Sequence, residues 1–113
     1  MSQAKEPLKR KVVFAPESAR KREFFELPRA IAIQFALQLE ERIALGLNPT
    51  LPIAHLGDGM VELKINGSPA YRCVYTLKKP GQVVVLNTFV KTTNGSDHHN
   101  VEKARKRLKD VLR

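Results

Sequence analysis

The chain has 113 residues, with 42% hydrophobic and 27% charged side chains, a composition typical of one soluble globular domain. It contains no run of 18 apolar residues, so no membrane span or membrane partner is expected, and its first residues lack the apolar segment of a secretory signal. The lone cysteine, Cys73, excludes an internal disulfide and favours a reducing compartment, so we expect a cytoplasmic protein.

Positive charge is in excess and lies mainly at the two ends of the chain. Basic residues outnumber acidic ones by 20 to 11, a net charge of +9. Residues 1–23 carry seven basic and three acidic side chains, and residues 101–113 carry six and two. This distribution predicts a polyanionic partner, with nucleic acid as the first choice, although a basic surface that meets only solvent is the simpler alternative.

The first part of the chain is predicted to contain a tail and a strand. Residues 1–9 are polar and show no periodicity, so we expect a flexible basic N-terminus before a domain that spans residues 10–113. Residues 11–15 (KVVFA) are β-branched or aromatic and predict an edge strand.

Two helices and a loop are predicted next. Pro16 is suited to the start of a helix, and we predict a short helix over residues 18–27 that ends before Pro28. Residues 29–45 form the longest predicted helix, because apolar side chains recur along one stripe at Ile31, Phe35, Leu39 and Ile43. The proline- and glycine-rich residues 47–59 read as a loop.

Residues 60–91 are predicted to form three consecutive strands, over 60–65, 70–77 and 82–91, separated by the turns NGSP and KKPG. Side chains alternate between the two faces of a strand. We therefore expect the apolar rows to face the helices and the polar side chains to share an open face. That open face would group Glu62, Lys64 and Arg72, with Lys91 joining at the strand end.

Residues 100–112 are predicted to form a C-terminal helix with an apolar stripe, capped by Ser96, Asp97 or Asn100. Its remaining surface is basic and is a candidate RNA-binding surface, consisting of Lys103, Arg105, Lys106, Arg107 and Lys109. The complete order is β-α-α-β-β-β-α. It predicts a single α+β domain in which a helical hairpin and a C-terminal helix pack on one side of a twisted antiparallel sheet.

Five short segments and the C-terminal helix share their order and spacing with a known family. The segments are FFELP at 24–28, ALGLNP at 44–49, LGDGMVELK at 56–64, YRCVY at 71–75 and VVVLNTFVKTT at 83–93. An AxxR pattern in the C-terminal helix, at Ala104 and Arg107, completes the set. Over roughly residues 10–112, the chain resembles toxins of the RelE/ParE superfamily and is most similar to the phage-derived Gp49-like, or HigB-like, branch.

This resemblance implies a RelE-like fold and a toxin that is paired with an antitoxin, commonly one with a helix-turn-helix domain. RelE-like members are ribosome-dependent endoribonucleases that cut mRNA without a metal or cofactor. The 2′-hydroxyl attacks the scissile phosphate, and negative charge builds on the phosphorane oxygens. Fixed cations aimed at those oxygens lower the barrier, and an acid and a base assist the proton transfers.

The resemblance also assigns candidate catalytic residues. Arg72 matches the family's strand arginine and is the first candidate for binding phosphate, the alternative being a salt bridge to Glu62. Lys64 matches a position that often carries arginine and would assist electrostatically unless it meets only solvent. Lys91 could hold phosphate or transfer a proton. Glu62 could orient Arg72 or act as a base, and the structural role is favoured.

Two positions depart from the family pattern. Asn87 stands where a histidine is common, and Thr92 replaces a lysine, so a titratable group and a charge are missing. His98 and His99 could supply the acid or base, although two histidines in a polar loop more often meet only solvent. No third ligand at a suitable spacing supports a metal site. These departures keep two alternatives open, a non-enzymatic gyrase inhibitor of the ParE type and an inactive nucleic-acid-binding member neutralised by its antitoxin.

Overall fold

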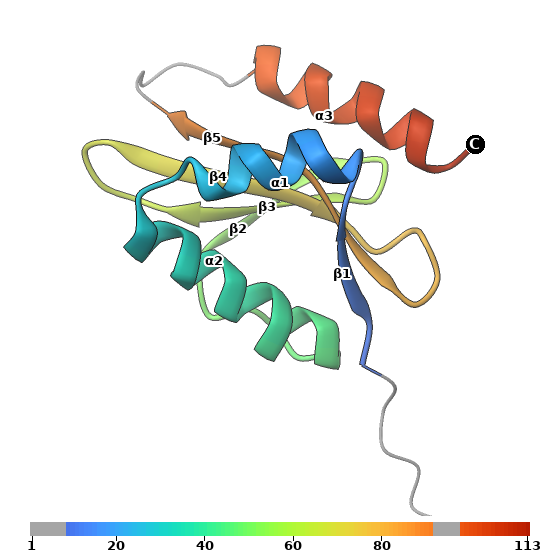
Figure 1. Cartoon of the computed structure of the whole chain (residues 1–113), viewed down its shortest axis with the longest axis horizontal. Coiled ribbons are helices and arrows are strands. Elements are labelled where there is room, and N and C mark those ends of the chain that lie inside the picture. The colour runs from blue at the N-terminus through green and yellow to red at the C-terminus, as the bar shows by residue number, and fades with distance from the viewer. Residues whose placement is uncertain (1–8, 92–97) are drawn as a thin grey trace, which may run out of the picture.

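The computed structural model describes residues 9–91 and 98–113, which form one five-stranded sheet with helices on both faces (Figure 1). The strands are β1 (Lys11–Phe14), β2 (Ile53–Gly57), β3 (Met60–Ile65), β4 (Ala70–Thr76) and β5 (Gln82–Lys91). The helices are α1 (Glu17–Phe25), α2 (Arg29–Glu41), the 3-10 turn η1 (Ile43–Leu45) and α3 (His98–Val111). The predicted α+β class and the order of the predicted elements are confirmed. The predicted flexible tail and the proposed caps Ser96 and Asp97 lie largely outside the described residues.

All three predicted central strands are present, and turn residues separate them. The limits of β3 and β5 agree with the prediction, and β4 ends one residue early, at Thr76. Gly81 precedes β5 with a φ of 75°, a left-handed conformation that glycine adopts without a Cβ clash. The predicted long helix is divided into α2 and η1, and Gly46, with a φ of 78°, ends it as expected.

The segment predicted to be a loop contains a fifth strand, β2. It pairs antiparallel with β3, from Ile53 opposite Leu63 to Gly57 opposite Met60, with an irregularity between His55 and Gly57. The prediction missed it because β2 is short, lies at the edge of the sheet and has no continuous apolar run. Backbone pairing with β3 holds it in place, and the Gly57–Asp58–Gly59 turn joins the two strands.

The sheet order is β1-β5-β4-β3-β2, so the first strand of the chain lies beside the last. Strands β3 to β5 pair antiparallel as expected, and the unpredicted β2 pairs antiparallel with β3. Strand β1 instead runs parallel to β5, from Lys11 opposite Gln82 to Phe14 opposite Val85. The four-residue β1 accompanies only the first part of β5, which continues to Lys91.

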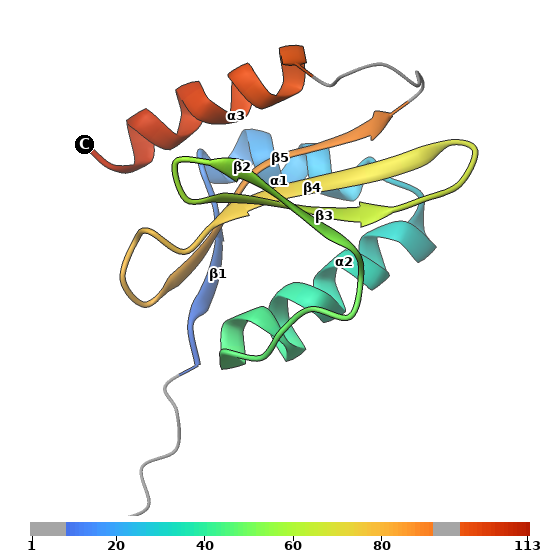
Figure 2. The same cartoon turned by 180° about the vertical axis from the view of Figure 1, so that it is seen from behind.

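The prediction that all helices pack on one side of the sheet was wrong. Helices α1 and α2 cover one face, where Phe35, Leu39, Leu63 and Val85 form the larger core. Helix α3 covers the opposite face, where Ala104 and Leu108 join a second core with Met60, Val74, Val84 and Leu86 (Figures 1 and 2). The apolar run in β5 explains this arrangement, because a strand that is apolar on both faces must be covered on both.

Within the described residues, no helix is both long and apolar enough to cross a membrane.

Two phenylalanines in the helical hairpin are expected to contribute differently to the free energy of unfolding, because only one of them is buried in the larger core. Phe35 is fully buried, whereas Phe25 is 65% exposed. We expect Phe35→Ala to lower the free energy of unfolding by about 3–5 kcal/mol, because it leaves a cavity under α2. The matched variant Phe25→Ala should change it by less than about 0.5 kcal/mol. Urea unfolding followed by circular dichroism measures both values, and equal losses would contradict the assigned core.

Candidate functional site

The predicted catalytic cations lie on one face at one end of the sheet. Lys64 in β3 is directly opposite Arg72 in β4, and Arg72 is opposite Phe89 in β5. Lys91 pairs with Ala70, two residues from Arg72, so its side chain belongs to the same face. The prediction that these three cations share a face is confirmed.

The expectation that this face is open was wrong for two of its four polar residues. Glu62 and Arg72 are 5% and 6% exposed, whereas Lys64 and Lys91 are half-buried. The face carries its own apolar core under α3, and Arg72 lies between Lys64 and Phe89 of the neighbouring strands. Alternation in the sequence identified the face of each side chain but not what would cover that face.

Glu62 and Arg72 form a buried ion pair. The Nε of Arg72 lies 3.7 Å from the Oε1 of Glu62, and its Nη1 donates a hydrogen bond to the carbonyl of Tyr71 at 3.0 Å. Each of these charges compensates the other in a site removed from water, and removal of either one would leave a costly unpaired charge. The pair fixes the guanidinium at the floor of the cationic face, which agrees with the structural role favoured for Glu62.

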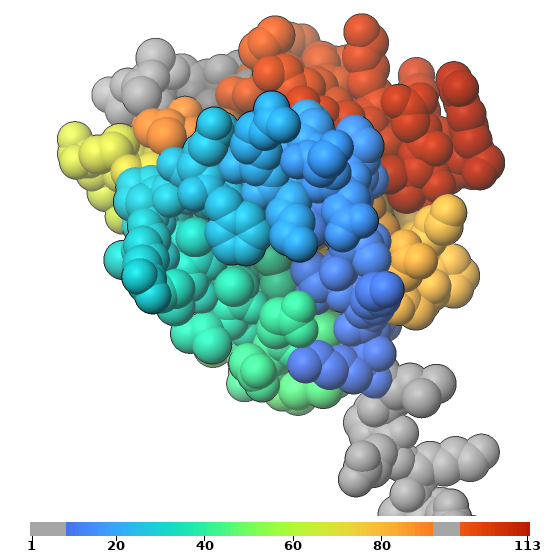
Figure 3. All heavy atoms as spheres, in the orientation of Figure 1, coloured from blue at the N-terminus to red at the C-terminus, as the bar shows by residue number. Residues whose placement is uncertain are grey.

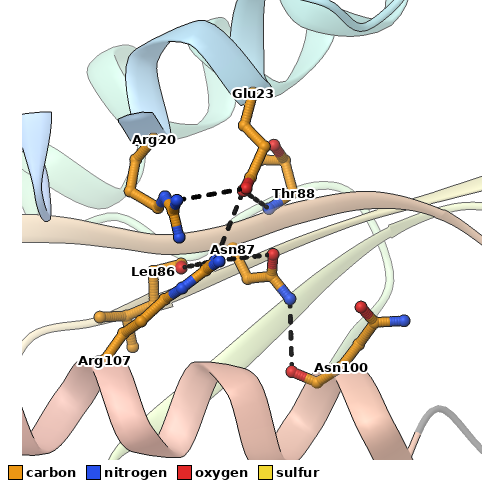
Figure 4. A network of polar contacts seen from close by, with 7 residues as sticks. All are labelled: Arg20, Glu23, Leu86, Asn87, Thr88, Asn100 and Arg107. Carbon is orange, nitrogen blue, oxygen red and sulfur yellow. Dashed lines mark hydrogen bonds and ion pairs between the residues drawn. The ribbon is translucent and has the colours of Figure 1, made fainter. Parts of the chain in front are cut away.

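Arg107 of α3 connects the helix to β5 and to α1. Its Nη1 donates to the carbonyl of Leu86 at 2.8 Å and to the Oδ1 of Asn87 at 3.0 Å (Figure 4). The same nitrogen lies 3.5 Å from the Oε1 of Glu23 in α1. One guanidinium therefore links both helical layers to the strand between them.

Glu23 and Asn87 complete this network. Glu23 accepts a hydrogen bond from the backbone N–H of Thr88 at 3.4 Å and lies 3.5 Å from Arg20. The Nδ2 of Asn87 donates to the carbonyl of Asn100 in the first turn of α3 at 3.3 Å (Figure 4). Sequence reasoning missed Glu23, because Glu23 and Arg107 are 84 residues apart and belong to no common motif.

The basic residues of α3 divide into two groups. Arg105 and Arg107 point toward the sheet side. The Nε of Arg105 donates to the Oδ2 of Asp58 at 2.8 Å, and its Nη1 donates to Glu102 at 2.6 Å. The other predicted RNA-binding residues, Lys103, Lys106 and Lys109, are exposed. The two arginines therefore hold α3 in place, and the three lysines face solvent.

Comparison with protein families agrees with this architecture. The family model described as "Phage derived protein Gp49-like (DUF891)" matches residues 22–109, most of the chain. The chain belongs to this family. Gp49-like proteins are RelE/HigB-like, phage-derived and toxin-like, so the resemblance in the sequence is confirmed. No curated protein matches the chain.

In this Gp49-like chain, Asn87, which stands where the resemblance led us to expect histidine, forms structural hydrogen bonds. Its amide both accepts from Arg107 and donates to Asn100. It is 2% exposed. An amide does not titrate at ordinary pH, so any acid or base for catalysis must come from another residue.

His98 and His99 begin α3 rather than lying in the loop where the sequence placed them. Both are exposed, and His99 lines a shallow pocket of about 260 Å³ with Glu102, Lys103 and Lys106. The first turn of α3 contacts Asn87, four residues from Lys91, which places the histidines toward the cationic end of β5. Among the described residues, no group of three potential ligands could hold a metal ion.

Cys73 and Tyr75 lie on the other face of β4 and belong to the larger core. Burial raises the pKa of the Cys73 thiol, and the nearby charge of Glu62 raises it further. Burial likewise raises the pKa of Tyr75 to about 12. Both groups stay protonated at neutral pH, and Cys73 is a core residue rather than a reactive thiol.

The buried ion pair makes a specific prediction about stability. We expect Glu62→Gln to lower the free energy of unfolding by about 3–5 kcal/mol, because the guanidinium of Arg72 keeps its charge without a counter-charge. The matched control is Glu40→Gln, which breaks the exposed pair with Lys9 and should cost less than about 1 kcal/mol. Chemical unfolding measures both values, and an equal, small cost for the two would contradict the assigned burial of the pair.

The contact between Asp58 and Arg105 predicts a pH dependence. The hydrogen bond and the charge of Arg105 hold the pKa of Asp58 below its usual value of 3.8. The carboxylate therefore stabilises the fold above that value, and the contribution is lost as the pH falls through the lowered pKa. We expect wild type to have a higher Tm than Asp58→Asn at neutral pH and the difference to close in strong acid.

An Arg105→Gln background provides the control for this measurement. Without the guanidinium, the further change Asp58→Asn should leave the Tm nearly unchanged across the same pH range. A persistent Tm difference in that background would show that Asp58 acts through another contact.

Proposed function

We propose that this protein is the toxin of a type II toxin–antitoxin pair and acts as a ribosome-dependent mRNA endoribonuclease. Its membership of a toxin-like family is the starting point. The observation that carries the enzymatic part is the placement of Lys64, Arg72 and Lys91 on one face of three hydrogen-bonded strands. Rigid strands hold charged groups in a fixed relation, which is what electrostatic stabilisation of a transition state requires.

The proposed reaction uses the substrate's own 2′-hydroxyl as the nucleophile and needs no metal or cofactor. Lys64 and Lys91 are half-buried, so their ammonium groups are the ones placed to meet phosphate oxygens. Arg72 lies beneath them, oriented by Glu62, and keeps a guanidinium close to the same phosphate. The cations stabilise the charge that develops on the phosphorane, and in-line placement of the RNA supplies the rest of the acceleration.

Proton transfer and RNA binding are assigned to the first part of α3 and its outer surface. His98 or His99 acts as the acid or base, since both are exposed at the start of α3 and Asn87 does not titrate. The exposed Lys103, Lys106 and Lys109 attract the phosphates of mRNA and of the ribosome, an attraction that salt weakens.

The proposed cellular setting follows from the family. The toxin is cytoplasmic and is neutralised by a cognate antitoxin, of the helix-turn-helix type, within a hetero-oligomeric complex. In this proposal the antitoxin blocks the basic face by covering it, because that face is where the substrate phosphates must bind.

A second candidate function is supported by the burial of Arg72. A guanidinium that is 6% exposed and paired with Glu62 offers little surface to a phosphate. Together with the structural role of Asn87, this favours a toxin that acts without cleaving RNA, either a gyrase inhibitor of the ParE type or a nucleic-acid-binding relic. Lys64 and Lys91 are less buried than Arg72, and this supports cleavage as the first choice.

Growth of cells that express the protein tests the first choice. We expect wild type to arrest growth and Lys64→Ala or Lys91→Ala to relieve the arrest, because losing one charge-stabilising group slows cleavage by about 100-fold or more. Lys78→Ala is the matched control, because Lys78 is exposed and lies beyond the opposite end of β4. The Lys78→Ala variant should remain toxic. The buried pair is removed as a unit, in Glu62→Gln/Arg72→Met, to avoid an unpaired charge.

Two outcomes separate the candidates. Arrest that persists in both lysine variants would remove those side chains from the mechanism. If wild type also blocks decatenation by purified gyrase and leaves mRNA intact, the ParE-type function replaces the endoribonuclease.

A further inference from the structure

An apolar groove runs between the two N-terminal helices, on the face opposite the cations. Its volume is about 580 Å³, and apolar side chains from β1, α1 and α2 line it, among them Val12, Phe14, Phe25, Leu27, Ile33 and Ala36. The face formed by α1, α2 and β1 is the one turned toward the viewer in Figure 3.

The rim of this groove exposes large apolar side chains. Phe25 of α1 and Ile33 of α2 both line the groove and are 65% and 48% exposed. Apolar side chains scattered singly over a surface need no explanation, but two exposed ones that line the same apolar groove form a patch of the kind that partners cover.

The charges around Phe25 define which partner fits. Lys21, Arg22 and Arg29 are exposed on either side of it in the chain, against the single exposed carboxylate of Glu26. At the other end of the groove, Glu40 lies 3.3 Å from Lys9, which balances its charge. The Phe25 end is therefore cationic and complements an acidic partner. A second copy of this chain would instead bring like charges together.

We propose that this groove binds an amphipathic helix of a separate, acidic partner protein. Apolar residues on one stripe of that helix would fill the groove beside Phe25 and Ile33, and acidic residues flanking the stripe would meet Arg22 and Arg29. An apolar groove is a surface into which an amphipathic helix can lay its apolar face. The inference holds whether or not the protein cleaves RNA, since a partner bound here leaves Lys64 and Lys91 uncovered.

Two synthetic helical peptides of about five turns test this proposal. Both carry the same leucine and phenylalanine stripe, and glutamate flanks it in one peptide and lysine in the other. We expect the glutamate peptide to bind the full-length protein at least about tenfold more tightly in fluorescence polarisation. Phe25→Ala should weaken the binding of the glutamate peptide by about tenfold or more. Val90→Ala, which changes an exposed apolar residue of β5, should leave this binding unchanged.

Two measurements can contradict this proposal: the location of the peptide-binding site and the oligomeric state of the protein. Backbone NMR shifts caused by the glutamate peptide should map to α1 and α2. Shifts confined to α3, equal binding of the two peptides, or no binding of the glutamate peptide at millimolar concentration would overturn the proposal. A dimer in light scattering that Phe25→Ala dissociates would assign the groove to a second copy instead.

Discussion

The structure depends on the attachment of α3 to the second face of the sheet. Strand β5 is apolar on both faces, so α1 and α2 alone cannot remove it from water. Ala104 and Leu108 supply the apolar cover, and Arg107 supplies the polar attachment, with contacts to Leu86, Asn87 and Glu23. These contacts satisfy a backbone carbonyl and two polar side chains at once, so loss of Arg107 would leave the buried carbonyl of Leu86 and the buried Oδ1 of Asn87 without these hydrogen bonds.

Placing α3 there gives the two faces of the molecule different chemical characters. On the α3 face, the buried pair of Glu62 and Arg72 underlies the half-buried Lys64 and Lys91. On the other face, an apolar groove has a cationic end. A protein with two such surfaces can meet a polyanion on one side and a folded partner on the other, and each surface can be altered without disturbing the other core.

Part of the fold could be predicted from residues that are close together in the sequence. The turns at 66–69 and 78–81 and the alternation beside them determined the limits of β3 and β5 and the shared face of Arg72 and Lys64. Strand β2 was missed because its stability comes from pairing with β3 rather than from its own residues. The role of Glu23 depends on where α3 packs, and no short segment encodes that long-range contact. The burial of Arg72 depends on its neighbours in the sheet and on its pairing with Glu62, which the alternation of β4 alone does not reveal.

The direct test of the central proposal is the chemistry of the cut RNA. Purified protein is incubated with ribosomes and mRNA in a buffer that keeps the magnesium that ribosomes need. A chelator selective for other divalent metal ions is added, and the ends of the RNA fragments are analysed by mass spectrometry. The account predicts fragments ending in a 2′,3′-cyclic phosphate for wild type and none above background for Lys64→Ala/Lys91→Ala. Intact mRNA with wild type, or undiminished cleavage by the double variant, would contradict it.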